Sequence, residues 1–239
     1  MKKSFFPVLF VYCMVFSAAL AVTVLGSRSV TVFQEQQPPI RHNRIVIDAG
    51  HGGLDGGATS CTGVLESGIN LQIALRLEDL FHLLGHETVM IRKTDTSVYT
   101  QGQTIAAQKI SDLKERVHMT NSTENAFLLS IHQNTFSQSR YFGSQVFCAA
   151  DSRSRSFGEM LQQNLKSALC QKTDRKAKNA KGIYLMENIH CPGVLIECGF
   201  LSNPEEEARL RDPEYQKKLC CVIAGTLSSY FSLDQMLPD

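Results

Sequence analysis

The 239-residue sequence contains no tryptophan and no excess of either charge. Its 24 lysines and arginines are balanced by 23 aspartates and glutamates, and the formal net charge of +1 gives no electrostatic support for a nucleic-acid partner. No internal repeat and no low-complexity segment is present. Hydrophobic residues make up 43% and charged residues 20%, which excludes a disordered or collagen-like chain. The sequence therefore predicts one globular domain with a short appendage, and we expect a monomer.

The cysteines form no CxxC pair, so a zinc site built from cysteines is not expected. They number eight, at positions 13, 61, 148, 170, 191, 198, 220 and 221. Cys148, Cys198, Cys220 and Cys221 have apolar neighbours in the sequence, as does Cys13, and this favours buried free thiols that pack as small hydrophobic residues. A disulfide between residues 191 and 198 is the alternative.

The N-terminal segment differs from the rest of the chain. Lys2 and Lys3 precede residues 5–25, which contain no charged residue and match the roughly 20 residues of a membrane span. Ala19 and Ala21 would also suit a signal-peptide cleavage site. Residues 1–26 are thus predicted to be a signal peptide or a membrane anchor, and the remainder is expected to be exported.

A polar, proline-bearing linker over residues 27–43 separates this segment from a single α/β domain over residues 44–232, with a tail at 233–239. In that domain apolar runs typical of strands alternate with helical periodicity, which predicts a mostly parallel twisted sheet covered by helices on both faces. We expect strands at residues 44–48, 87–92, 126–131, 143–149 and 194–197, and helices at 67–84, 105–121, 154–169 and 212–231.

Four ionisable residues lie where predicted strands end or a helix begins: His51, Glu66, His132 and Glu197. The carboxyl ends of parallel strands line one crevice of an open α/β sheet, so these side chains are expected to converge. Two imidazoles and one carboxylate form the ligand set of a catalytic zinc site. A further carboxylate beside such a site can act as a general base.

Each of these residues also has a structural interpretation. The glycine-rich loop around His51 could be a polar turn or a phosphate loop, although GxxxxGK[ST] is absent. Glu66 could serve only the dipole at its helix N-terminus, and His132 could simply end a strand. Glu197 follows an apolar run and therefore needs a partner or a role. The other five histidines are interpreted as structural or exposed, and the acidic run at 205–207 as a solvated helix face.

Several motifs in one order resemble a known family. They are IVIDAGHGG at 45–53, GVLE at 63–66, LLSIHQN at 128–134 and GVLIECGFLSNPEEEARL at 193–210, linked by MIRKTD, LKERVHMTN and KGIYLMEN. Together they resemble the zinc-dependent N-acetylmuramoyl-L-alanine amidases of the amidase-3 group over residues 44–231. The resemblance implies that His51, Glu66 and His132 bind Zn²⁺ and that Glu197 is the catalytic glutamate. It also implies cleavage of the amide between the lactyl group of N-acetylmuramic acid and L-alanine in peptidoglycan.

Within that family the short chain is similar to the sporulation-specific enzymes, which act on spore cortex on the route to muramic-δ-lactam. This likeness implies a membrane-anchored or secreted protein in the intermembrane space of the developing spore, with an activating lipoprotein as a candidate partner. Residues 133–142 are too few for the helix that plugs the cleft of some relatives. The alternatives are a catalytically silent wall-binding module and a zinc peptidase or deacetylase acting on another amide.

Overall fold

The computed structural model describes residue 14 and residues 43–234. The predicted signal or anchor at 1–26 and nearly all of the linker at 27–43 lie outside the described residues, as does most of the tail at 233–239. No helix in the described part of the chain is long and apolar enough to cross a membrane.

A six-stranded sheet in the order β2-β1-β3-β6-β4-β5 forms the centre of the domain. Its strands are β1 (Arg44–Ala49), β2 (Thr88–Met90), β3 (Ala126–Asn134), β4 (Gln145–Cys148), β5 (Lys178–Asn179) and β6 (Gly193–Phe200). The pairs β1–β2, β1–β3 and β3–β6 are parallel, whereas β4 runs antiparallel to β6. The sheet is thus mostly parallel, as predicted.

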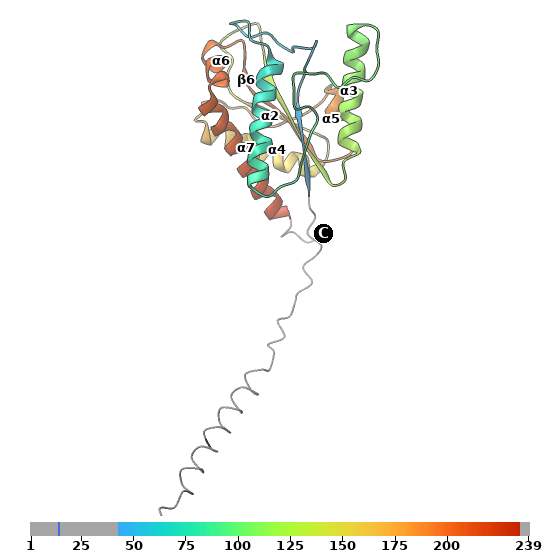
Figure 1. The fold of residues 1–239 in the computed structure, drawn as a ribbon. Helices are drawn as coiled ribbons and strands as arrows, with labels where there is room; N and C mark the ends of the chain where they lie inside the picture. The colour runs from blue at the N-terminus through green and yellow to red at the C-terminus, as the bar shows by residue number, and fades with distance from the viewer. Residues whose placement is uncertain (1–13, 15–42, 235–239) are drawn as a thin grey trace, which may run out of the picture. The chain divides into compact units, whose positions relative to one another are not determined.

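Helices cover both faces of the sheet (Figure 1). They are α2 (Glu66–Leu83), α3 (Ile105–Asn121), α4 (Ser152–Ala168), α5 (Tyr184–Asn188), α6 (Pro204–Arg211) and α7 (Pro213–Asp234). The larger core lies between the sheet and α2, α4 and α7, and the smaller one between the sheet and α3 and α5. Because both faces are buried, Ile45, Val46 and Ile47 of β1 are all fully inaccessible.

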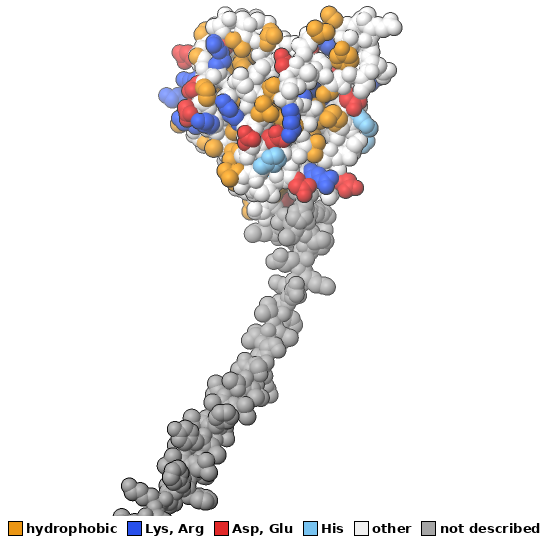
Figure 2. Space-filling view, viewed as in Figure 1, with side chains coloured by type: hydrophobic (Ala, Val, Ile, Leu, Met, Phe, Trp, Pro, Cys, Tyr) orange, Lys and Arg blue, Asp and Glu red, His pale blue; other side chains and the backbone are white. Residues whose placement is uncertain are grey.

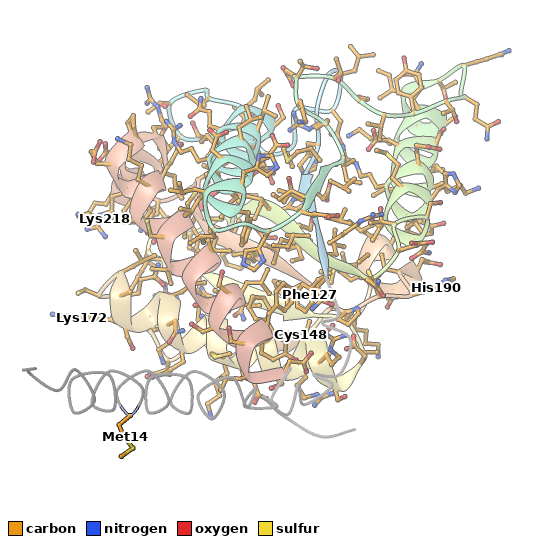
Figure 3. The ribbon with its side chains drawn as sticks, turned by 60° about the horizontal axis from the view of Figure 1, so that its bottom comes forward. Met14, Phe127, Cys148, Lys172, His190 and Lys218 are labelled. Atoms are coloured by element: carbon orange, nitrogen blue, oxygen red, sulfur yellow. The ribbon has the colours of Figure 1, made fainter. Side chains whose placement is uncertain are left out.

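Phe127 marks the middle of the larger core. Its ring meets Phe157 of α4 edge to face at 5.1 Å between centroids and Phe231 of α7 at 5.4 Å. Figure 3 shows Phe127 and Cys148 among the packed side chains, with Lys172 and Lys218 at the periphery. Edge-to-face aromatic pairs of this kind stabilise a core beyond the area that they bury.

The predicted alternation of strands and helices is confirmed, and α3 has the predicted bounds, with Thr104 capping its N-terminus through Ala107 N. Two strands extend further than predicted. β3 continues through Asn134 and β6 through Phe200, so His132 and Glu197 lie within strands rather than at their ends. The short elements β5 and α5 were not predicted.

The acidic run at 205–207 corrects a further prediction, because only Glu205 is exposed there. Glu206 accepts hydrogen bonds from the backbone N–H groups of Gly143 and Phe200. Glu207 accepts hydrogen bonds from the hydroxyls of Ser60 and Thr62 and pairs with Arg211. These two carboxylates join α6 to loops at the same edge of the sheet.

The seven described cysteines are all free thiols, so residues 191 and 198 form no disulfide. Cys148, Cys198 and Cys220 are buried, as expected. Cys221 is exposed, contrary to the prediction, because it follows Cys220 on α7 and therefore faces away from the core. Figure 2 shows lysines and arginines interspersed with acidic side chains on one face of the domain, in keeping with its balanced charge.

Candidate active site

Three of the four predicted residues meet at one edge of the sheet. His51 lies in the loop after β1, Glu66 is the first residue of α2, and His132 is on β3. One nitrogen from each histidine and one carboxylate oxygen of Glu66 all lie within 4.8 Å of one another, close enough to hold a metal ion. The two imidazole rings are 5.0 Å apart between centroids and nearly perpendicular.

Glu66 is the centre of this cluster and is only 3% exposed. Its Oε1 lies 3.0 Å from His132 Nδ1, and its Oε2 lies 3.4 Å from His51 Nε2. Oε1 also accepts hydrogen bonds from the Asn70 side chain and the Gln133 backbone N–H. Burial alone would raise the pKa of Glu66, but the hydrogen bond with His132 and the two imidazole charges outweigh it and lower the pKa to about 2.

His51 is oriented by its neighbours. Its Nδ1 lies 2.8 Å from Oδ2 of Asp55, and Oδ1 of Asp55 pairs with Lys109 at 2.8 Å. The second ring nitrogen of His51, Nε2, therefore faces Glu66. A carboxylate on the far nitrogen is the usual partner of a metal-binding histidine. His51 has a left-handed φ of 62°, and its carbonyl accepts a hydrogen bond from Arg116 at 2.7 Å. The surrounding contacts thus maintain an uncommon backbone conformation.

Two glycines make room for the rings. A Cβ on Gly50 would lie 2.2 Å from the His132 imidazole, and one on Gly57 would lie 2.6 Å from Glu66 Oε2 and 2.7 Å from the His51 ring. These glycines therefore allow backbone to approach the three donor side chains closely.

Glu197 lies beside the cluster on β6, where it is the register partner of His132 across the parallel β3–β6 pair. One of its carboxylate oxygens, Oε2, is buried and has no hydrogen-bond partner among the residues that the structure describes. Burial raises the pKa of Glu197 to about 7, with the charge of Glu66 adding to the shift and that of His132 opposing it. A buried carboxyl with such a pKa can both accept and return a proton near neutral pH.

The sequence prediction missed the side chains beneath the loop. Asp48 of β1 is buried against Arg116 of α3 and accepts a hydrogen bond from Ser130 at 2.6 Å. Arg92 donates to the carbonyls of Ala49, Gly50 and Ser67. The sequence did hold one signal of this contact: Asp48 ends the apolar run RIVID, and a charged residue in such a run needs a buried partner.

The structure brings His51, Glu66 and His132 together and places Glu197 beside them. The donor set, the orientation of His51 by Asp55 and the space left by the glycines fit a divalent ion of the zinc type. An α/β domain with a His–Glu–His cluster next to a buried glutamate has the features of a metal-dependent hydrolase. Whether these residues bind metal and catalyse stays a prediction from the sequence and geometry.

The chain belongs to the N-acetylmuramoyl-L-alanine amidase family, whose Amidase_3 model matches residues 45–229. The germination-specific N-acetylmuramoyl-L-alanine amidase of Bacillus subtilis is 36% identical over 196 residues, covering 81% of this chain and 82% of that protein. The B. subtilis amidase LytC is 30% identical over 206 residues, covering 84% of this chain and 38% of LytC. The chain is thus an enzyme of the amidase class, and the sequence-based assignment is confirmed.

Solved structures give the same result. The CwlD amidase of Clostridioides difficile, determined in complex with the GerS lipoprotein, superimposes with a TM-score of 0.77 at 35% identity over 80% of this chain and 100% of CwlD. The catalytic domain of CwlV from Bacillus (Paenibacillus) polymyxa var. colistinus gives a TM-score of 0.69 at 29% identity, over 80% of this chain and 98% of that domain. The single α/β fold is thus the fold of known amidases.

Proposed function

We propose that the protein is a zinc amidase in which His51, Glu66 and His132 bind the ion and Glu197 moves the proton. The observation that carries this proposal is the His–Glu–His cluster within 4.8 Å, next to a glutamate with an unpartnered buried oxygen. The substrate is the amide between the lactyl group of N-acetylmuramic acid and L-alanine.

When bound, Zn²⁺ supplies a Lewis acid that polarises the lactyl carbonyl and makes water more acidic. The chain's own residues do the rest. The Glu197 carboxylate takes one proton from the attacking water while the water oxygen forms the new bond to the carbonyl carbon. As the carbon–nitrogen bond breaks, Glu197 returns that proton to the alanine nitrogen. Its pKa of about 7 suits both transfers.

The cellular role that we propose is in spores. The B. subtilis relative is named for germination, and the chain covers 82% of it. We infer that this protein removes peptide stems from spore cortex peptidoglycan on the route to muramic-δ-lactam. This role requires export, and residues 1–26 would direct the protein to or across the cytoplasmic membrane. Cell-wall amidases among its other relatives support a site of action outside the cytoplasm.

We also propose a lipoprotein partner. The C. difficile amidase was solved with the GerS lipoprotein, and 80% of this chain aligns with 100% of the solved amidase chain. A membrane-linked partner would suit a protein that is itself anchored or secreted at the membrane.

The deciding experiment is digestion of purified muropeptides, followed by mass spectrometry of the new ends. The amidase leaves a free lactyl carboxylate and an L-alanine amine, and Glu197→Gln should lower this activity by roughly 10²–10⁴-fold, since a general acid–base group contributes that much. The exposed Glu205→Gln serves as the matched control and should retain full activity. Zinc content should be equal in all three proteins.

A peptide fragment released with the sugar–peptide bond intact would instead identify a peptidase. Full activity in Glu197→Gln would remove Glu197 from the mechanism.

A further inference from the structure

A row of residues leads across the sheet away from the metal cluster. His132 on β3 is in register with Glu197 on β6, and Glu197 is in register with Gln145 on β4. The amide of Gln145 then donates to the carbonyl of Lys176 at 2.7 Å, just before β5. Neighbouring strands are about 4.8 Å apart, so the backbone of Lys176 lies roughly 10 Å from that of Glu197.

The row ends at a hollow that nothing in the proposed mechanism uses. The hollow has a volume of about 490 Å³ and is lined by Gln145, Thr173, Asp174, Arg175, Lys176 and Lys178. Three of these side chains are cationic and one is anionic. Lys176, Lys178 and Asp174 are exposed, whereas Arg175 is half-buried. The hollow thus carries net positive charge in a domain whose charges otherwise balance.

Arg175 is held in place without a carboxylate. Its guanidinium lies over the ring of Phe200, 4.8 Å from the centroid, and its Nε donates to the carbonyl of Phe142 at 3.1 Å. Across the described part of the chain it takes part in no ion pair within 4.0 Å. Burial raises the pKa of the nearby Glu206, and the positive charge of Arg175 opposes that rise. The oxygens of Glu206, however, accept hydrogen bonds from the backbone N–H groups of Gly143 and Phe200 and form no ion pair with Arg175. A fixed guanidinium without a paired carboxylate is prepared to bind an anion.

We propose that this hollow binds a carboxylate of the peptide stem, with Arg175 as the main contact. This inference rests on the proposed amidase function. In the substrate the lactyl carboxyl is already an amide and the acetylated sugars are neutral, so free negative charge is found on the peptide. Three residues of extended peptide span about 10 Å, so a stem whose first amide lies at Glu197 reaches the hollow by its second or third residue.

The test uses two substrates that differ only in one group: N-acetylmuramoyl-L-alanyl-D-glutamate with its γ-carboxyl capped as the methylamide, and the α-carboxamide of the same capped compound. The zinc-loaded full chain should have a kcat/KM about 10- to 100-fold higher for the acid, as expected for a charge-assisted hydrogen bond in place of a neutral one. In Arg175→Gln that preference should largely disappear because the acid loses its partner. Lys181→Gln removes an exposed cation outside the hollow and should keep the preference.

A variant that leaves Arg175 intact covers the case in which Arg175→Gln fails to fold. In K176Q/K178Q both changed residues are exposed, and the preference should fall in part, more steeply at low salt than at high salt. Equal kcat/KM for acid and amide in the wild type would overturn the proposal, and so would an unchanged preference in folded Arg175→Gln.

Calorimetric titration with L-alanyl-D-glutamate separates this inference from the amidase function. If peptide binding weakens about tenfold or more in Arg175→Gln, the result supports the proposed carboxylate site even when neither substrate is cleaved. Failure of the wild type to cleave either substrate would count against the amidase function alone. Cleavage of both substrates with no measurable effect of Arg175→Gln on peptide binding would leave the amidase function standing and reject the hollow.

Discussion

At the scale of single residues, the His–Glu–His cluster depends on the absence of a side chain at Gly50 as well as on its three donor side chains. Gly50 lies where any side chain would overlap the His132 ring, with 2.2 Å to the nearest ring atoms. No left-handed φ is required at Gly50, so its conformation alone would permit alanine. Steric room for the imidazole is therefore the reason for glycine at this position.

We predict that Gly50→Ala lowers zinc affinity by at least about tenfold, the lower end of the loss seen when the surroundings of a ligand are disturbed. The added methyl group must displace His132 or the loop, so amidase activity at limiting zinc should fall in parallel. Gly68→Ala is the matched control, because a Cβ there has no neighbour within 4 Å. It lies within α2 and should leave zinc affinity unchanged while stabilising the protein by up to about 1 kcal/mol.

Competition with a chromogenic chelator measures both affinities. A Gly50→Ala protein that binds zinc as tightly as the wild type would show that the His132 ring does not contribute to the site.

At the same scale, the sequence predicted which four ionisable residues would meet but not their environment. The apolar run before Glu197 indicated that this glutamate needed a role. Its orphaned Oε2 and the rise of its pKa to about 7 depend on side chains from other strands. Likewise, Asp55 is close to His51 in the sequence, so their contact could be expected. The ion pair of Asp55 with Lys109 could not, because it depends on where α3 packs.

At the scale of secondary structure, Asp48 and Arg116 connect β1 to α3 directly beneath the loop of His51. Arg116 is 2% exposed and Asp48 is 1% exposed. Burial alone would raise the pKa of Asp48, but the positive charge of Arg116 and the Ser130 hydrogen bond help to lower it below its ordinary value of 3.8. A buried carboxylate with a lowered pKa stabilises the fold wherever the unfolded chain would be ionised.

We predict that Asp48→Asn lowers the free energy of unfolding by about 1–3 kcal/mol at pH 7, because Arg116 loses one of its two carboxylate partners and keeps only Asp112. The contribution of Asp48 is complete above its unfolded pKa and is lost as the pH falls through the lower folded pKa. The difference between wild type and variant should therefore be constant from pH 8 to pH 5 and shrink below about pH 4. Urea titrations at pH 7, 5 and 3 measure it.

Asp79→Asn, on the exposed side of α2, is the control and should change stability by less than about 0.5 kcal/mol. An Asp48→Asn deficit as large at pH 3 as at pH 7 would contradict an ionised Asp48 in the folded protein.

Element types were predictable from periodicity, whereas element ends and the burial of α6 were not. The ends of β3 and β6 depend on ladder hydrogen bonds between the two strands, which continue to the pair Asn134–Phe200 after the apolar runs have stopped. Glu206 is buried because it bonds Gly143, 63 residues earlier, and Phe200. Composition alone makes a run of three glutamates resemble a solvated surface, and only the tertiary contacts correct that interpretation.

At the scale of the whole domain, the parallel core of the sheet explains why distant residues converge. β1, β3 and β6 are neighbours and end at the same edge, which brings together residues 51, 132 and 197, while α2 begins there with Glu66. The antiparallel β4 then starts at that edge, so Gln145 and the cationic hollow lie next to Glu197. The topology thus sets the metal cluster and the proposed peptide site side by side.

Because the proposed ligands come from a loop, a helix start and a strand, bound zinc should stabilise the domain as a whole. At a free zinc concentration 100 times Kd, mass action adds about 2.7 kcal/mol, which for a domain of this size raises Tm by roughly 5–10 °C. Scanning calorimetry should show this rise, reversed by EDTA, in the wild type and equally in Glu197→Gln, whose changed group is not a proposed ligand. His51→Ala should lose most of the rise, since two donors bind zinc far more weakly than three. A full zinc-dependent rise in His51→Ala would mean that zinc binds elsewhere, whereas a loss of the rise in Glu197→Gln would make Glu197 a ligand rather than the base.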